Sequence, residues 1–187
     1  ALNQAFTNDT FLQENGLTKE TALTLFIPNT YEFYWNTSAK KIADKMAKEH
    51  KKFWTNERLE KAKALNMTPA QVYTLASIVH KETVKADERP RVAGAYLNRI
   101  NQDMPLQADP TVIYAIKETS GDFDQVIKRV GGSNLFVKSP YNTYINKGLP
   151  PGPIAMPDIS AIDAVLNAEK HDYIYFCADP NRPGYHA

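Results

Sequence analysis

The chain has 187 residues, of which 43% are hydrophobic and 23% are charged. These are ordinary values for a folded domain, so they predict one domain with at most a small appendage and exclude a largely disordered chain. The formal net charge is +1. A near-neutral balance argues against nucleic-acid binding as the main task, because that task usually needs a strong basic excess.

Cys177 is the only cysteine, which excludes an internal disulfide and makes a cysteine-based metal site unexpected. The four histidines match no metal-ligand spacing, and no glycine motif that cradles phosphate is present, so we expect no metal and no cofactor. No apolar run approaches the ~20 residues that span a bilayer. The chain opens with Ala-Leu-Asn rather than Met. We therefore expect a piece of a longer protein, with any anchoring segment outside this sequence.

The first third of the chain is predicted to be helical apart from one aromatic segment. The expected elements are two short helical stretches within residues 1–27 around the turn signal Asn15-Gly16, an extended aromatic segment at residues 31–35, a helix from Thr37 or Ser38 to about Phe53, and a helix from Thr55 to about Leu65. Lysines cover most of residues 38–66, which indicates a solvated face.

The strongest local signal is Thr68-Pro69-Ala70-Gln71. It combines an N-cap hydroxyl, a proline in the first turn and a capping-box glutamine, so it predicts a helix that runs to about Thr83. The elements expected after it are helices at about 87–100, 109–116, 123–130 and 158–167, a proline-rich loop between Ser139 and Pro157, and a strand at Tyr173–Cys177. Together they predict an α+β fold that is mostly helical with a small β element.

Helical spacing singles out Glu82. At ~100° per residue it lies ~20° from Leu75 and ~40° from Ile78, on the apolar face, whereas His80 lies ~160° away from Glu82. A carboxyl group on a buried face has a raised pKa, which suits a general acid. The alternative is that Glu82 only pairs with Arg89 or Arg91 near the helix end. Spacing by itself leaves both interpretations open.

Three further acidic residues stand at predicted helix starts: Asp87, Glu88 and Asp109. Helix capping is the simpler interpretation of all three. Local sequence therefore does not indicate a pair of catalytic carboxylates, although the fold could bring Asp109 close to Glu82.

The proline-rich loop offers side chains suited to a sugar ligand. Tyr141 and Tyr144 present flat faces with hydroxyl groups, and Asn142 presents an amide. Prolines and glycines stiffen the loop, which lowers the entropy lost when it holds a ligand. The alternative is a surface loop held in place by tyrosine packing.

Several segments, taken together and in order, resemble one known family. They are Leu75-Ala-Ser-Ile-Val-His-Lys-Glu-Thr83, Arg91-Val-Ala-Gly-Ala-Tyr-Leu-Asn-Arg99, Leu106-Gln-Ala-Asp-Pro-Thr-Val-Ile-Tyr114, Tyr141-Asn-Thr-Tyr144 and Gly148-Leu-Pro-Pro-Gly-Pro-Ile154. This order resembles the YceG-like (MltG) endolytic murein transglycosylases over roughly residues 25–187.

The resemblance implies a lysozyme-like catalytic domain at residues 28–187, preceded at residues 1–27 by the remnant of a LysM-like subdomain. Its Glu-Thr pattern falls on Glu82-Thr83, so Glu82 is the expected catalyst. Tyr141, Asn142 and Tyr144 are expected to line the substrate groove, with Gln107 and Asp109 opposite them. Many members carry an acidic residue where this chain has His80.

The implied activity is cleavage of the bond between N-acetylmuramic acid and N-acetylglucosamine inside peptidoglycan strands, with 1,6-anhydro ends and a limit on strand length. A catalytically silent peptidoglycan-binding module and a hydrolytic muramidase are the alternatives. The implied partners are glycan strands and cell-wall synthases. The implied location is the cell envelope, at the outer face of the inner membrane, through an N-terminal helix that this sequence lacks.

Overall fold

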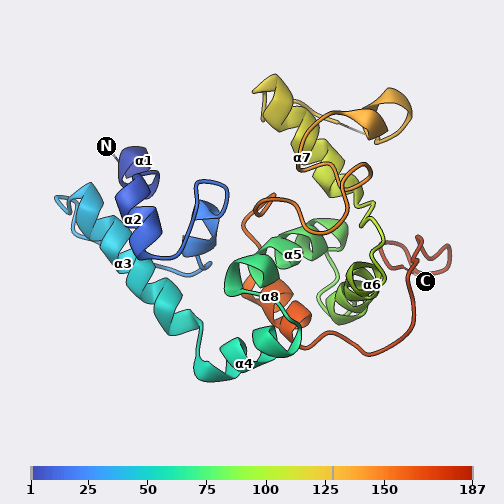
Figure 1. The fold of residues 1–187 in the computed structure, drawn as a ribbon, viewed down its shortest axis with the longest axis horizontal. Helices are drawn as coiled ribbons and strands as arrows, with labels where there is room; N and C mark the ends of the chain where they lie inside the picture. The colour runs from blue at the N-terminus through green and yellow to red at the C-terminus, as the bar shows by residue number, and fades with distance from the viewer. Residues whose placement is uncertain (1, 128, 187) are drawn as a thin grey trace.

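The structure is a computed structural model that describes residues 2–127 and 129–186, and it is mostly helical (Figure 1). In chain order its helices are α1 (Leu2–Phe6), α2 (Asp9–Glu14), the 3-10 turn η1 (Ala22–Leu25), α3 (Ala39–Phe53), α4 (Asn56–Ala64), α5 (Pro69–Glu82), α6 (Arg89–Asn101), α7 (Asp109–Ser120), the 3-10 turn η2 (Gly132–Phe136) and α8 (Ile159–Leu166). The mostly helical prediction is confirmed. None of the helices in the described ranges has the length and apolar character needed to cross a membrane.

Helix α5 is the centre of the molecule. Its capping box forms as predicted: the Thr68 hydroxyl accepts from the Gln71 amide at 3.3 Å, and the Gln71 side chain accepts from the Thr68 amide at 2.8 Å. Every residue from Val72 to Val79 is buried. Such a helix is stabilised mainly by packing, and α5 contacts α6, α7 and α8.

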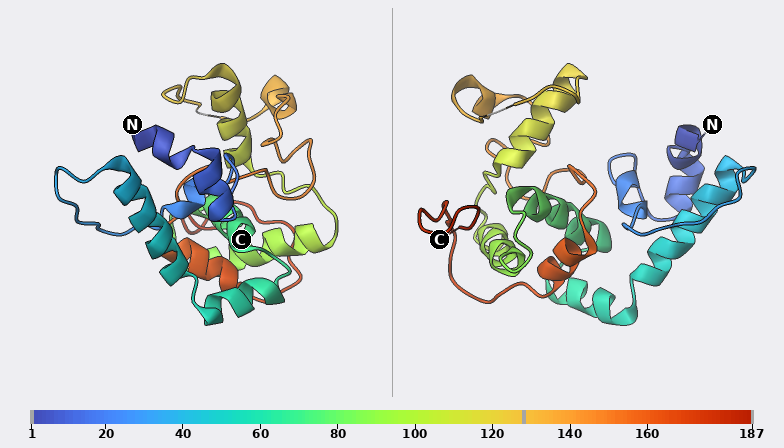
Figure 2. Two further views of the ribbon diagram at one scale, coloured as in Figure 1. Left: turned by 60° about the vertical axis from the view of Figure 1, so that its left-hand side comes forward. Right: turned by 180° about the vertical axis from the view of Figure 1, so that it is seen from behind.

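The buried apolar side chains form two clusters. The larger surrounds α5 and includes residues from α6, α7 and α8. The smaller combines residues 6–25 with one face of α3. Figure 2 shows α1 and α2 beside α3, at the opposite side of the molecule from α6 and the C-terminal segment. Within the first 27 residues, Gly16 adopts a left-handed backbone (φ 68°) and separates α1 and α2 from η1.

The proline-rich loop is held against the core rather than free on the surface. The Ile154 amide donates to the Ser77 hydroxyl on α5 at 3.1 Å. A Cβ on Gly152 would lie 2.0 Å from the Glu20 carbonyl oxygen, so only glycine permits this close approach. The loop is thereby fixed between α5 and the N-terminal segment.

The helix predicted at residues 123–130 is wrong. The Asp122 carboxylate accepts from the amides of Asp124 and Gln125 in a local turn, which competes with helix formation. Phe123 and Val126 are more than half exposed, so no apolar face would stabilise a helix here. The next helical turn, η2, begins only at Gly132. Residue 128 lies outside the described residues.

The strand predicted at Tyr173–Cys177 is also wrong. Among the described residues, β pairing is limited to an isolated antiparallel bridge between Ala178 and His186. The segment instead lies along α6, where the side chains of Asn98 and Arg99 donate to the carbonyls of Tyr173 and Ile174 at 2.9 and 2.6 Å. Helix side chains thus occupy acceptors that a neighbouring strand would have used.

Candidate active site

Glu82 is the last residue of α5, and its partly buried carboxylate faces α6. The hydroxyl of Tyr96, on α6, donates to Glu82 Oε2 at 3.0 Å. Tyr96 is almost completely buried, so this bond fixes the carboxylate from the protein side. The apolar spacing predicted this inward position for Glu82.

Burial raises the pKa of Glu82, and the nearby negative charge of Asp109 adds to this effect. The hydrogen bond from Tyr96 and the positive charges of His186 and Arg99 act in the opposite direction but do not cancel the rise. Glu82 therefore keeps its proton to a higher pH than an exposed glutamate. This is the property that a general acid needs.

The alternative that Glu82 only pairs with a neighbouring arginine is wrong. The Arg89 guanidinium donates to Ser160 at 2.6 Å and to Asp158 at 3.4 Å. Arg91 pairs with Glu169 at 3.2 Å. Both arginines are thus directed to other acceptors.

Asp109 is the second acidic residue of the site. It does not cap α7 as predicted, because it is the first residue inside the helix and Ala108 occupies the N-cap position. Its Oδ1 instead accepts a hydrogen bond from the Tyr144 hydroxyl at 2.6 Å. This contact raises the pKa of Tyr144, after the larger effect of burial.

Thr143 joins the start of α7 to the proline-rich loop. Its carbonyl accepts from the Gln107 amide at 3.0 Å, its hydroxyl accepts from the Ala108 amide at 3.1 Å, and that hydroxyl lies 2.8 Å from the Thr111 hydroxyl. Segments 107–109 and 141–144 therefore lie side by side and form one wall, rather than facing each other across a groove. The Gln107 side chain is exposed on this wall.

The side chains of Tyr141 and Asn142 are buried beneath the exposed residues of that wall. Asn142 is completely buried: its amide donates to the carbonyls of Leu135 and Val137 at 3.0 and 2.9 Å, and its oxygen accepts from the Tyr144 amide at 2.9 Å. The Tyr141 ring packs on Tyr114, with their centroids 4.6 Å apart, and burial raises the pKa of Tyr141 to about 12. Of the three loop residues, Tyr144 is the one whose side chain reaches Asp109.

A second cluster of hydrogen bonds joins the turn after α5 to the C-terminal segment. Glu88 does not cap α6 with its side chain; its carboxylate accepts from the Thr83 hydroxyl at 2.9 Å and from the backbone amide of His186. Burial favours a higher pKa for Glu88, but the hydrogen bonds from His186 and Thr83 outweigh it and leave the pKa lowered. Asp87 likewise makes no cap and accepts from the Tyr185 hydroxyl at 3.3 Å. The C-terminal segment is thus fastened to the turn after α5.

His80 is directed away from Glu82, as helical spacing predicts. Its Nδ1 lies 3.4 Å from Asp158 and 3.4 Å from an Arg89 nitrogen, at the start of α8. Burial lowers the pKa of His80, and this outweighs the opposite effect of Asp158. The residue at position 80 therefore belongs to a helix junction outside the candidate site.

Sequence reasoning missed two positioning residues of the site, Tyr96 and Arg99. Arg99 donates to the Ile174 carbonyl at 2.6 Å and to the Leu106 carbonyl, so it ties the loop before α7 to the C-terminal segment. Val92, Tyr96 and Arg99 follow i, i+4, i+7 spacing on α6. Polar groups within such a buried stripe need partners, and this was the available signal. Within the described ranges, no group of three or more His, Cys, Asp or Glu side chains is arranged to hold a metal ion.

Comparisons with known proteins agree with one another. The model of the YceG-like family matches residues 2–187. An endolytic murein transglycosylase of Bacillus subtilis (strain 168) is 35% identical over 176 residues, which cover 94% of this chain and 46% of that protein. A protein of the same name from Streptococcus pneumoniae serotype 2 (strain D39) is 34% identical over 152 residues, which cover 81% of this chain and 27% of the relative.

A crystal structure described as a yceG-like protein from Listeria monocytogenes superposes with a TM-score of 0.80 at 30% identity, covering all of this chain and 63% of that one. The chain spans less than half the length of the two curated relatives. A family match along nearly the whole chain, together with this agreement in fold, shows that the chain belongs to the YceG-like family.

Proposed function

We propose that this chain carries the catalytic site of an endolytic lytic transglycosylase that acts on peptidoglycan, with Glu82 as its general acid and base. The observation that carries the proposal is the partly buried Glu82 carboxyl, with its pKa raised by burial and its orientation fixed by Tyr96. The curated relatives in the family bear the name endolytic murein transglycosylase, which supports the same reaction.

In the first step, protonated Glu82 donates its proton to the glycosidic oxygen between N-acetylmuramic acid and N-acetylglucosamine, and the C1–O bond of the muramic residue breaks. The 2-acetamido oxygen of that residue stabilises the positive centre at C1, so no protein nucleophile is required. Burial, together with the smaller effect of the negative charge of Asp109, favours the protonated form of Glu82 before this step.

In the second step, ionised Glu82 takes the proton from the C6 hydroxyl of the same muramic residue, and O6 bonds to C1. This closes a 1,6-anhydro ring and returns Glu82 to its protonated form. The attacking hydroxyl is part of the substrate, so its high effective concentration favours ring closure over attack by water. Tyr96 holds Glu82 for both proton transfers, because its hydroxyl stays bonded to one carboxylate oxygen.

The exposed wall of Gln107, Asp109 and Tyr144 is suited to orient the sugars, because it offers an amide, a carboxylate and a hydroxyl on a fixed frame. Asn142 and Tyr141 support this wall from below, since their side chains are buried. Their contribution to substrate binding is therefore to position Tyr144.

We further propose a lysozyme-like arrangement of the catalytic part, with residues 1–27 as the remnant of a LysM-like subdomain and residues 28–187 as the catalytic domain. The separate apolar cluster of residues 6–25 supports a distinct N-terminal unit, although this cluster also includes one face of α3. In the whole protein we propose an anchor in the inner membrane, a location at the outer face of that membrane, and cell-wall synthases as partners.

A hydrolytic muramidase is the second candidate, because the fold brings a second carboxylate, Asp109, into electrostatic range of Glu82. A catalytically silent binding module was suggested by His80, but His80 lies outside the candidate site. Mass spectrometry of the products from uncrosslinked glycan strands separates the three. We expect 1,6-anhydro ends; free reducing ends would show the hydrolase, and intact strands would show the binding module.

A further inference from the structure

A groove lies along α7, beside the helix ends that carry Glu82 and Asp109. One face of that helix lines it at i, i+3, i+4 and i+7 spacing, together with the end of α5 and two loops. The lining residues are Lys81, Pro110, Ile113, Tyr114, Lys117, Phe123, Ile154 and Ala155. Lys81 directly precedes Glu82 and Pro110 directly follows Asp109, so the groove is lined by a sequence neighbour of each carboxylate. Its volume is about 360 Å³, within the range of small-ligand sites.

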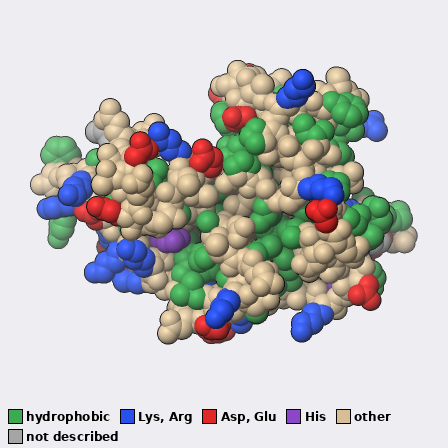
Figure 3. Space-filling model, viewed as in Figure 1, with side chains coloured by type: hydrophobic (Ala, Val, Ile, Leu, Met, Phe, Trp, Pro, Cys, Tyr) green, Lys and Arg blue, Asp and Glu red, His purple; other side chains and the backbone are tan. Residues whose placement is uncertain are grey.

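The lining combines an apolar floor with two ammonium groups. Ile113 and Tyr114 are half-buried and Phe123 is 55% exposed, so apolar surface remains open along the groove. Hydrophobic side chains also reach the surface in the middle of the face shown in Figure 3. Lys81 is exposed, and its ammonium group makes no hydrogen bond or ion pair with another described residue. The Lys117 ammonium donates to the Phe123 carbonyl at 2.9 Å and retains two further donors.

This chemistry differs from that of the neighbouring wall. The wall of Gln107, Asp109 and Tyr144 offers acceptors and donors that suit sugar hydroxyls. The groove has no carboxylate and no carboxamide among its lining side chains. It therefore suits a ligand with carboxylates and small apolar side chains rather than another stretch of sugar.

We propose that this groove binds the peptide stem carried by the muramic residue whose bond is cleaved. The inference rests on the proposed function, which places that residue at Glu82. The stem leaves the sugar close to the reacting bond, and the residue before Glu82, Lys81, lines the groove. Its free carboxylates pair with Lys81 and Lys117, and its alanine methyl groups pack on Ile113 and Phe123. The enzyme then prefers strands that carry peptides over bare strands.

The test compares two substrates: uncrosslinked strands with intact peptide stems, and the same strands after an amidase has removed the stems. The readout is the ratio of kcat/KM on peptide-bearing strands to kcat/KM on bare strands. We expect this ratio to exceed 1 for the wild type. We expect Lys81→Gln to lower it about two- to fivefold through KM, as for loss of one solvent-exposed ion pair. Lys81→Gln with Lys117→Gln should lower it further.

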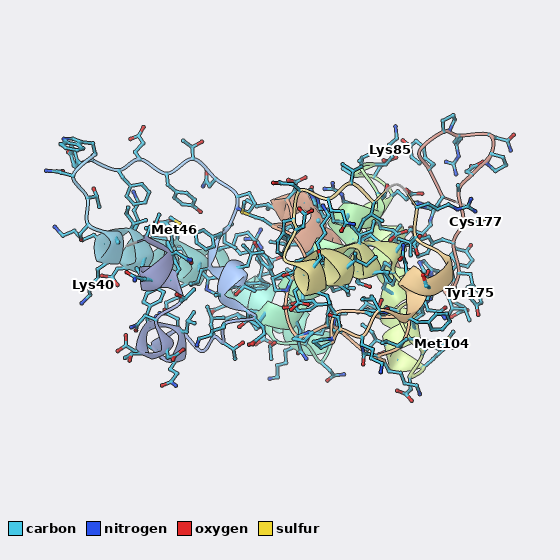
Figure 4. All side chains as sticks on the ribbon, turned by 90° about the horizontal axis from the view of Figure 1, so that it is seen from above. Lys40, Met46, Lys85, Met104, Tyr175 and Cys177 are labelled. Atoms are coloured by element: carbon cyan, nitrogen blue, oxygen red, sulfur yellow. The ribbon has the colours of Figure 1, made fainter. Side chains whose placement is uncertain are left out.

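Lys40→Gln is the matched control, because Lys40 is an exposed lysine of α3 at the far end of the molecule from Lys85 and Tyr175 (Figure 4). It should leave the ratio unchanged. Binding of a free stem pentapeptide, measured by calorimetry, gives a readout that needs no turnover, and Lys81→Gln should weaken it.

The outcomes separate this inference from the proposed function. Equal cleavage of both substrates, with an unchanged ratio in the double variant, would overturn the groove assignment and leave the transglycosylase intact. Absence of cleavage on both substrates would overturn the proposed function. In that case, pentapeptide binding that is lost in Lys81→Gln would still support the groove, and absence of binding would refute it.

Discussion

Replacement of Glu82 by glutamine tests the catalytic assignment with little change in shape. The amide oxygen of the introduced side chain can still accept the hydrogen bond from Tyr96, but the side chain no longer carries a proton that titrates. Loss of acid–base catalysis typically costs ~10²–10⁴-fold in rate, which corresponds to about 2.7–5.4 kcal/mol in the barrier. We expect kcat to fall by at least this factor while glycan binding survives.

The same substitution should raise the free energy of unfolding, although it lowers kcat. The pKa of Glu82 is higher in the folded protein than in the unfolded chain, chiefly because of burial. Between these two pKa values the folded state binds more protons, so the free energy of unfolding falls as pH rises through that window. Each unit by which the pKa in the folded protein exceeds the pKa in the unfolded chain lowers the free energy of unfolding by about 1.4 kcal/mol, once the group is ionised in both states. Glutamine has no such cost, so Glu82→Gln should be more stable than the wild type at pH 7.

Urea denaturation at pH 7 and at pH 4, together with product analysis on glycan strands, measures both effects. The stability gap should shrink at pH 4, where Glu82 is largely protonated in the folded protein. Glu60→Gln on α4 is the control, because Glu60 is an exposed glutamate distant in sequence from the site. Cleavage by Glu82→Gln at the wild-type rate would refute the mechanism. A stability deficit that is equal at both pH values would identify Glu82 as a structural anchor.

Three other substitutions address the surroundings of Glu82. Tyr96→Phe removes the hydrogen bond that lowers the pKa of Glu82, so the alkaline limb of the pH–rate profile should move to higher pH; an unchanged profile would contradict this coupling. Tyr144→Phe removes the hydrogen bond to Asp109 and should raise KM while changing the free energy of unfolding by less than about 1 kcal/mol. Steady-state kinetics and denaturation of the same preparation test both expectations. Asn142→Ala removes three buried hydrogen bonds and should lower the free energy of unfolding by about 3 kcal/mol. A variant with unchanged stability and impaired turnover would show instead that Asn142 contacts the substrate.

The sequence alone determined the helices whose signals are local. The capping box at Thr68 and the apolar stripe of α5 specify where that helix begins and which side faces the core, and this is enough to direct Glu82 inward and His80 away. Local signals failed where tertiary contacts competed. Segment 173–177 has strand-like residues, but the side chains of Asn98 and Arg99 take its carbonyls.

Only the tertiary structure decided what surrounds Glu82. Asp87, Glu88 and Asp109 all stand at helix starts, where sequence favours capping, yet their carboxylates accept hydrogen bonds from hydroxyls and an amide in distant parts of the chain. Tyr96 looks like one more apolar position on α6 until packing brings its hydroxyl to Glu82. A helix start or a buried stripe is specified by residues a few positions apart. A site is specified by segments that come into contact only after folding, and the pKa values of its residues depend on the burial, charges and hydrogen bonds that those contacts create.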